Sequence, residues 1–195
     1  MIYTIGDSHS QFTFHDIPEV KAFWLGPMTM HRVGRDSLNF KQHGVPTDRS
    51  VMACFGEIDA RCHVQKQSLA TGQSIDAVIS DLLSRYINAL LVNANEYKII
   101  VMGIVPPAYF ERADNNADFP FTGTNSERAV ITKKMNIVLE ELCKVHNLKF
   151  IDIYSLYADA SGMLPPELGD ECDGKGVHIK ITDRIKECLK NNNLI

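Results

Sequence analysis

A serine follows the first apolar segment of the sequence directly, on a turn that contains glycine. Residues 1–5 are apolar and predict a buried strand, and Gly6-Asp7-Ser8 comes next. Open α/β sheets bind their ligands at the carboxyl ends of their strands, and glycine permits a tight turn that presents a small hydroxyl there. Asp7 is expected to hold this turn by accepting backbone N–H bonds. Because a hydroxyl attacks an acyl carbon once a base takes its proton, Ser8 is the candidate nucleophile.

The candidate base is His178, near the other end of the chain. It follows a loop rich in glycine and acid, in which Asp173 is the nearest carboxylate before it. A histidine base needs an acid that orients its ring. Gly174 and Gly176 allow the loop to fold tightly enough for Asp173 to reach that ring. The expected catalytic set is therefore Ser8, His178 and Asp173.

Further polar groups stand at the ends of two other predicted strands. Gly26 and Gly56 each follow an apolar strand-like segment, and a backbone N–H at such a place can stabilise an oxyanion. Glu57, Asp59 and Arg61 come immediately after Gly56. We interpret these three as a charge network that braces the floor of the site, with substrate binding as the alternative role.

The elements that must position these groups alternate between strands and helices. Apolar segments predict strands over residues 20–25, 50–55, 98–105 and 149–154, besides the first, and an extended segment over 28–33. Apolar spacings of three and four predict a long helix over 74–95. A second begins at Asn125 or Ser126, with a buried stripe that includes Val130, Ile137 and Val145, and His178 is expected to begin a last short helix that ends near residue 190. This alternation predicts one domain over residues 1–195, a three-layer α/β/α fold with a central parallel sheet of about five strands.

Composition excludes several classes of protein. A net charge of −4, with both signs dispersed, leaves no electrostatic footprint for nucleic acid. No apolar run approaches the roughly 18 residues that a membrane span requires. Five cysteines without a Cys-x-x-Cys pair argue for reduced thiols in the cytoplasm and against a zinc site or a disulfide scaffold. We therefore expect neither a metal nor another cofactor.

These motifs together resemble those of the SGNH, or GDSL-type, hydrolase family, in the right order over nearly the whole chain. Gly6-Asp7-Ser8 matches the first block of that family, and His178 matches its late histidine. The resemblance implies a flavodoxin-like fold, Ser8 as nucleophile and His178 as base. It also implies three oxyanion donors: the N–H of Ser8, the N–H of Gly26 (preferred to Gly34), and an asparagine in the third block. The implied activity is hydrolysis of O-acyl esters, with O-acetyl esters of carbohydrates as the expected substrates.

The sequence departs from the family pattern at two positions. The third block usually reads Gly-x-Asn-Asp, and here Ile58 stands where the asparagine is expected. Arg61, or a group from elsewhere, is the candidate replacement for that donor. The family also places its aspartate three residues before the histidine, where this chain has Lys175. Either the loop brings Asp173 to the ring, or the site works as a Ser8–His178 dyad.

Two alternative functions are compatible with the same residues. Asp7 and His9 follow a strand in the pattern Asp-x-His, which also begins the metal site of metallophosphoesterases. The other alternative is an SGNH fold that has lost efficient catalysis and binds a glycan or a protein partner, which Ile58 and Lys175 would favour. The number of subunits is left open by the sequence.

Overall fold

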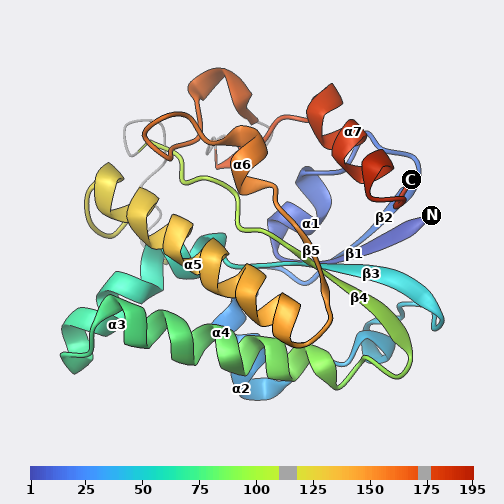
Figure 1. Ribbon diagram of the computed structural model, residues 1–195, viewed down its shortest axis with the longest axis horizontal. Coiled ribbons are helices and arrows are strands. Elements are labelled where there is room, and N and C mark those ends of the chain that lie inside the picture. The colour runs from blue at the N-terminus through green and yellow to red at the C-terminus, as the bar shows by residue number, and fades with distance from the viewer. Residues whose placement is uncertain (110–117, 171–176) are drawn as a thin grey trace.

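A five-stranded parallel sheet forms the centre of the computed structural model, which describes residues 1–109, 118–170 and 177–195 (Figure 1). Its strands lie in the order β2-β1-β3-β4-β5, with every neighbouring pair parallel. Their bounds are Ile2–Gly6 for β1, Val20–Trp24 for β2, Arg49–Cys54 for β3, Tyr97–Met102 for β4 and Lys149–Ile151 for β5. The predicted sheet of about five parallel strands is confirmed.

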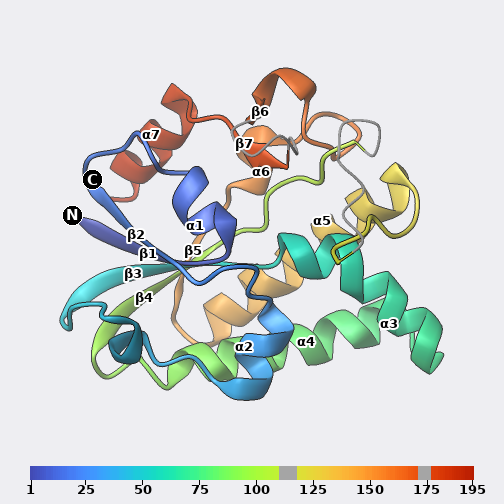
Figure 2. The ribbon, with the colours of Figure 1, turned by 180° about the vertical axis from the view of Figure 1, so that it is seen from behind.

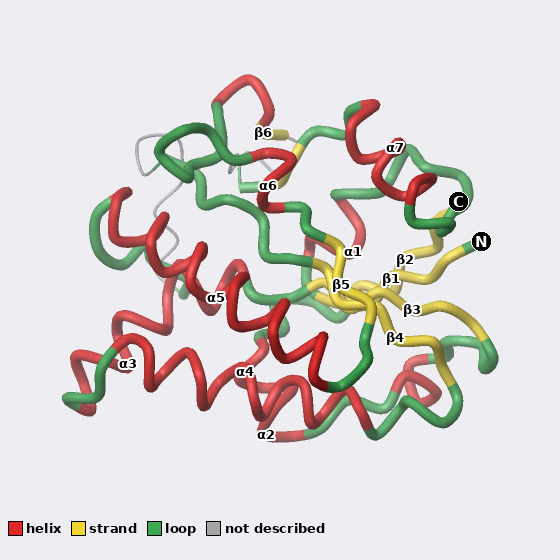
Figure 3. Tube along the Cα trace, in the orientation of Figure 1, coloured by secondary structure: helices red, strands yellow, loops and turns green. Residues whose placement is uncertain are grey.

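Helices cover both faces of this sheet, as Figure 3 shows. The α-helices are α1 (Ser8–Phe12), α2 (Met30–Asp36), α3 (Val64–Thr71), α4 (Ile75–Leu91), α5 (Asn125–Val145), α6 (Tyr154–Tyr157) and α7 (Asp183–Asn191). Helices α2, α4 and α5 lie on one face, and α1, α6 and α7 lie on the other. The shorter elements of the described residues are two 3-10 turns (Phe40–His43 and Pro166–Leu168), a π-helical turn (Asp59–His63) and an antiparallel pair of strands, β6 (Gly169–Asp170) and β7 (His178–Ile179). The three-layer α/β/α architecture is therefore confirmed.

Alternation along the central strands builds the two cores. In β3, Val51 and Ala53 pack toward α2, α4 and α5, whereas Met52 and Cys54 pack toward α6 and α7. A strand covered on both faces is apolar throughout, which explains why the sequence shows continuous apolar runs rather than alternation. No helix in the described ranges is long and apolar enough to cross a membrane.

Two predictions of secondary structure are wrong. Residues 28–33, expected to be extended, contribute to helix α2, which begins at Met30 behind its N-cap Thr29. His178, expected to begin a helix, lies instead in strand β7, and the last helix begins at Asp183. Both errors concern short segments whose conformation is set by partners elsewhere in the chain.

Candidate functional site

Ser8 and His178 meet although 170 positions separate them in the sequence. The Nε2 atom of His178 lies 2.8 Å from the Oγ atom of Ser8. Ser8 is the first residue of α1 and half-buried, and His178 is almost completely buried in β7. Figure 2 shows the β6–β7 pair beside α1, and the two elements are in contact. The arrangement places a potential base within hydrogen-bond distance of a potential nucleophile.

The turn that carries Ser8 depends on the absence of a side chain at Gly6. A Cβ atom at this position would lie 1.9 Å from the carbonyl oxygen of Cys54, on the neighbouring strand β3. The backbone of β1 therefore approaches β3 more closely than any other residue would allow. Asp7 continues this contact, since its N–H donates to the same carbonyl at 3.2 Å. Its carboxylate then caps α1 by accepting from the N–H of His9, as expected for a residue that holds the turn.

The site lies at the topological switch point of the sheet. The strand order is 2-1-3-4-5, so the connections from β1 and β3 leave toward opposite faces. Sheets of this kind bind ligands in the crevice between the carboxyl ends of two such strands. Ser8 follows β1, and Gly56 follows β3. A φ of +114° and contacts below 3 Å that a Cβ would make with Met30 and Ile104 restrict that position to glycine.

Glu57 and Arg61 form a buried ion pair beside this crevice. Arg61 donates from Nε to Oε1 of Glu57 at 2.6 Å and from Nη2 to Oε2 at 3.1 Å. Burial alone would raise the pKa of Glu57, but the charge and hydrogen bonds of Arg61 outweigh it, so the pKa is lowered and the carboxylate stays ionised. His9 and His178 also act electrostatically on Glu57, and Asp7 does so on Arg61. The pair therefore lies within electrostatic reach of the serine–histidine site.

The guanidinium of Arg61 is held by two further contacts besides Glu57. It donates to the carbonyl oxygen of Phe119 and lies 4.8 Å from the centre of the Phe121 ring. Arg128 from α5 lies over the same ring at 4.9 Å. Arg61 itself belongs to the π-helical turn Asp59–His63, an irregularity that is frequent at functional sites. These contacts fix the guanidinium in its buried position.

His9 is a site residue whose role the sequence analysis missed. It is buried, its Nδ1 lies 3.1 Å from Oδ1 of Asp7, and its Nε2 lies 3.3 Å from the carbonyl oxygen of Val177. Both partners accept hydrogen bonds only, so the imidazolium form is required to donate to both. Burial alone would lower the pKa of His9, but the Asp7 carboxylate outweighs that effect and raises it. His9 thereby ties the serine turn to the residue before His178, whose ring is 4.7 Å away.

This geometry predicts a pH-dependent contribution of His9 to stability. Because its folded-state pKa is raised above the ordinary value of 6.5, the contribution is fully present below that pH and is lost as the pH rises through the higher folded-state pKa. We expect His9→Gln to lower the free energy of unfolding by about 3 kcal/mol at pH 6, since it leaves Asp7 without a charged partner. The difference from the wild type should shrink toward pH 9.

Urea denaturation at several pH values measures this effect, and His146→Gln, at an exposed position after α5, is the control. Asp7, Glu57 and His178 are the titratable groups that face His9, so each curve is compared with that of the wild type in the same buffer. An unfolding free energy that shows the same pH dependence with and without His9 would mean that its ring is neutral in the folded protein.

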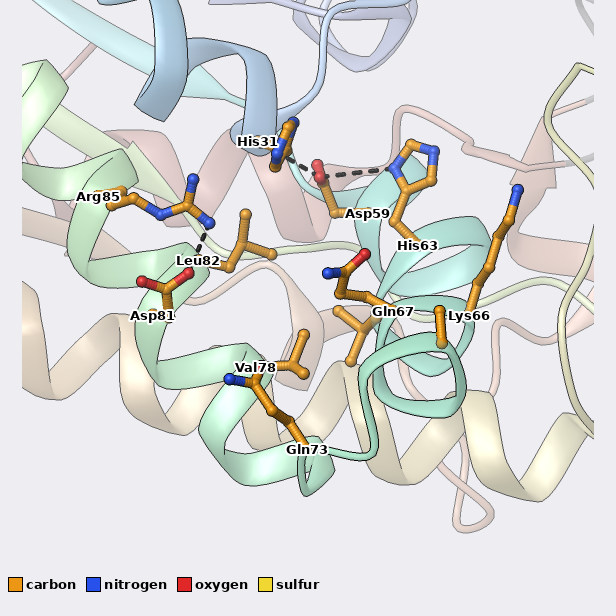
Figure 4. A pocket seen from close by; sticks show the side chains of 12 residues that line it. His31, Asp59, His63, Lys66, Gln67, Gln73, Val78, Asp81, Leu82 and Arg85 are labelled. Carbon is orange, nitrogen blue, oxygen red and sulfur yellow. Dashed lines mark hydrogen bonds and ion pairs between the residues drawn. The ribbon is translucent and has the colours of Figure 1, made fainter.

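Asp59 braces the neighbouring helix α2. Its carboxylate accepts from the N–H of Met30 at 2.7 Å and from that of His31 at 3.2 Å, which are the first donors of α2. Figure 4 shows Asp59 between His31 and His63 at a pocket of about 380 Å³ between α2, α3 and α4. Neither Ser8 nor His178 lines that pocket. The three charged residues after β3 thus separate: Glu57 and Arg61 pair with each other, and Asp59 supports helix α2.

The remaining predicted site residues are placed as follows. Gly26 follows β2, where the N–H of Leu25 donates to the carbonyl oxygen of Gly6 at 2.8 Å, so it lies at the same sheet edge as the serine turn. Asp173, the predicted acid, lies outside the described residues. Ile58, at the position of the family's asparagine, is buried. The bracing role of His9 could have been predicted from its position two residues after Asp7. At that spacing, the carboxylate of an N-cap residue can reach the imidazole of the histidine.

Fold and site together define a flavodoxin-like α/β protein in which a serine and a histidine lie within hydrogen-bond distance at the topological switch point of the sheet. Solved structures with this fold include a putative platelet activating factor from Streptococcus pneumoniae (14% identity, TM-score 0.65, covering 98% of this chain and 82% of that one). A GDSL-like lipase from Bacteroides thetaiotaomicron (15%, 0.62, 98% and 86%) and a putative lipolytic protein of the G-D-S-L family from Desulfitobacterium hafniense (15%, 0.54, 100% and 98%) also match. No family model and no curated protein sequence matches the chain. The chain therefore has the fold of the GDSL-type lipolytic proteins, as its motifs implied.

Proposed function

We propose that this protein is a serine ester hydrolase that acts on O-acyl esters, with Ser8 as the nucleophile and His178 as the base. The observation that carries the proposal is the 2.8 Å contact between Ser8 Oγ and His178 Nε2 at the topological switch point. Small O-acetyl esters are the proposed substrates. The fold shared with GDSL-type lipolytic proteins supports the same chemistry.

The reaction follows from the positions of these two side chains. Ser8 Oγ attacks the acyl carbon while His178 Nε2 takes its proton, and the carbonyl oxygen becomes an oxyanion. When the tetrahedral intermediate collapses, the bond to the alcohol oxygen breaks, and His178 returns the proton to the departing alcohol. Water then attacks the acyl-enzyme with the same base, which releases the carboxylic acid and restores Ser8.

The oxyanion requires donors at the crevice. Ser8 is the first residue of α1, and the first N–H groups of a helix have no acceptor within the helix. We assign the N–H of Ser8 and the N–H of Gly26 to this role, with Gly56 shaping the turn. Arg61, fixed by Glu57, is the proposed third donor in place of the asparagine that Ile58 replaces.

The proposed acid partner of His178 is Asp173. Asp173→Asn is expected to lower kcat by about a hundredfold or more, because an uncharged amide no longer stabilises the imidazolium that forms during the reaction. Asp170→Asn, at an aspartate of strand β6 whose backbone pairs with that of His178, is the matched control and should retain most of the activity. Steady-state kinetics with p-nitrophenyl acetate compare the two variants; equal activities for both would identify the site as a dyad.

The contacts of His9 weigh against the metallophosphoesterase alternative. In such a site, Asp7 and His9 would both turn toward a metal ion. Here they bond to each other, and the second nitrogen of His9 faces Val177. The residues that a metal would need are therefore engaged in bracing the serine turn.

The experiment that tests the proposed function combines labelling with turnover. A fluorophosphonate probe should label the wild type at Ser8, as peptide mass spectrometry can locate, and hydrolysis of p-nitrophenyl acetate should survive EDTA. Activity that EDTA abolishes and manganese restores would favour the phosphoesterase. Absence of both labelling and turnover would leave a binding protein built on a hydrolase fold.

A further inference from the structure

Trp24 is the one tryptophan of this chain, and it stands on the surface beside the site. It is the last residue of β2 and its side chain is 53% exposed. In the register of the sheet it pairs with Gly6, two positions before Ser8. Tryptophan has the largest apolar surface of any side chain, and its exposure beside a reactive centre points to a ligand surface.

An aromatic path connects Trp24 to the base. The ring of Phe12, at the end of α1, lies 4.9 Å from that of His178 and 6.2 Å from that of Trp24, tilted by 52° and 58°. Phe12 is half-buried, so the path leads from the buried histidine to the exposed indole. The three rings come from β7, α1 and β2, which only the tertiary fold brings together.

The chemistry of the proposed reaction decides which part of a substrate meets this path. His178 must return its proton to the departing alcohol, so the alcohol oxygen lies beside the imidazole during that step. The remainder of the alcohol then extends over Phe12, which adjoins His178, and beyond it over Trp24, which adjoins Phe12. The rings of Phe12 and Trp24 therefore contact the alcohol part of the ester.

We propose that Phe12 and Trp24 form a stacking platform for a sugar ring, so that the substrate is an O-acylated carbohydrate. This inference rests on the proposed ester hydrolysis. A pyranose ring presents C–H groups to an aromatic face and keeps its hydroxyls in water, as an exposed indole permits. An alkyl chain gains from complete removal from water, which a side chain that is half exposed does not supply.

The test uses two acetyl esters that differ in the presence of a ring. Glucose pentaacetate carries a pyranose, whereas triacetin carries the same acyl group on an acyclic polyol. We expect Trp24→Ala to lower the ratio of kcat/KM for glucose pentaacetate to that for triacetin by about tenfold, the effect of roughly one stacking contact. Trp24→Phe should restore part of the ratio, and Leu69→Ala, at an exposed position on α3, should leave it at the wild-type value.

Binding can be read separately, because Trp24 is the sole indole. In Ser8→Ala, glucose pentaacetate should change the tryptophan emission in a saturable way, and triacetin should not. The stacking platform would be wrong if Trp24→Ala left the ratio of the two kcat/KM values unchanged and glucose pentaacetate did not change the tryptophan emission of Ser8→Ala. If Trp24→Ala lowers kcat/KM only for p-nitrophenyl octanoate, the two rings bind acyl chains, and the proposal of a carbohydrate substrate is wrong. If the wild type hydrolyses neither acetate while the emission still responds to the sugar ester, the proposed hydrolysis fails and the platform stands.

Discussion

Replacing Ser8 by alanine is expected to reduce ester turnover by about 10⁴-fold or more. The change removes the nucleophile, and what remains is catalysis by oxyanion stabilisation and substrate binding alone. The hydroxyl is lost from a half-buried position at the start of α1, so the fold should persist. The measurement is kcat/KM on p-nitrophenyl acetate, with the melting temperature recorded for the same preparation.

Ser155→Ala provides the control, since this serine is exposed on α6. It should match the wild type in turnover and in melting temperature. If Ser8→Ala also retains full activity, an acyl-enzyme on this residue is excluded and the assignment of the Ser8–His178 pair as the catalytic machinery is wrong.

Replacing Arg61 by lysine is expected to lower kcat by about a hundredfold to a thousandfold while changing KM little. Loss of one oxyanion donor has an effect of this size, and it acts on the transition state rather than on the bound substrate. Lysine keeps a positive charge near Glu57, so the carboxylate is not left buried without a cation. It lacks the planar fork with which Arg61 bonds both carboxylate oxygens and the Phe119 carbonyl.

Glu57→Gln is the matched variant for this experiment. Glutamine still accepts from Nε of Arg61 and loses only the bond from Nη2, while the Phe119 carbonyl still holds the guanidinium, so we expect a loss in kcat of less than about tenfold. Comparison of kcat, KM and melting temperature for both variants separates the two roles. A wild-type kcat in Arg61→Lys, with only the melting temperature lowered, would identify Arg61 as part of the scaffold and leave the oxyanion to the backbone donors.

The hydrophobic pattern of the sequence was sufficient to predict the central strands and the longest helices. The strands β1, β3 and β4 are mostly apolar, and the helix α4 has its apolar residues at spacings of three and four. Such periodicity follows from burial on one or both faces of an element and can be read without knowing the partner. It placed Ser8 at a strand end, and it predicted the parallel sheet that forms.

The same pattern misled where the neighbours are polar. In α5, Val130, Ile137 and Val145 were expected to be buried, and their exposed fractions are 52%, 49% and 77%. Arg128 and Asn136 are buried instead, because Arg128 donates to the carbonyl oxygen of Gly123 and Asn136 bonds both the N–H and the carbonyl of Ile104. A polar group can be buried where it finds a hydrogen-bond partner. The spacing of hydrophobic residues gives no information about such partners.

The sequence by itself determined which chemical groups the protein carries and which strand ends present them: Ser8 after β1, and Glu57 with Arg61 after β3. Only the tertiary structure decided that His178 lies in a strand, because its backbone pairs with that of Asp170. It also decided that residues 28–33 contribute to a helix, whose first N–H groups bond Asp59, and that His9 is bound by Val177 far along the chain. Short segments have little conformational preference of their own, so distant hydrogen-bond partners select their shape, and those partners meet only when the sheet has formed.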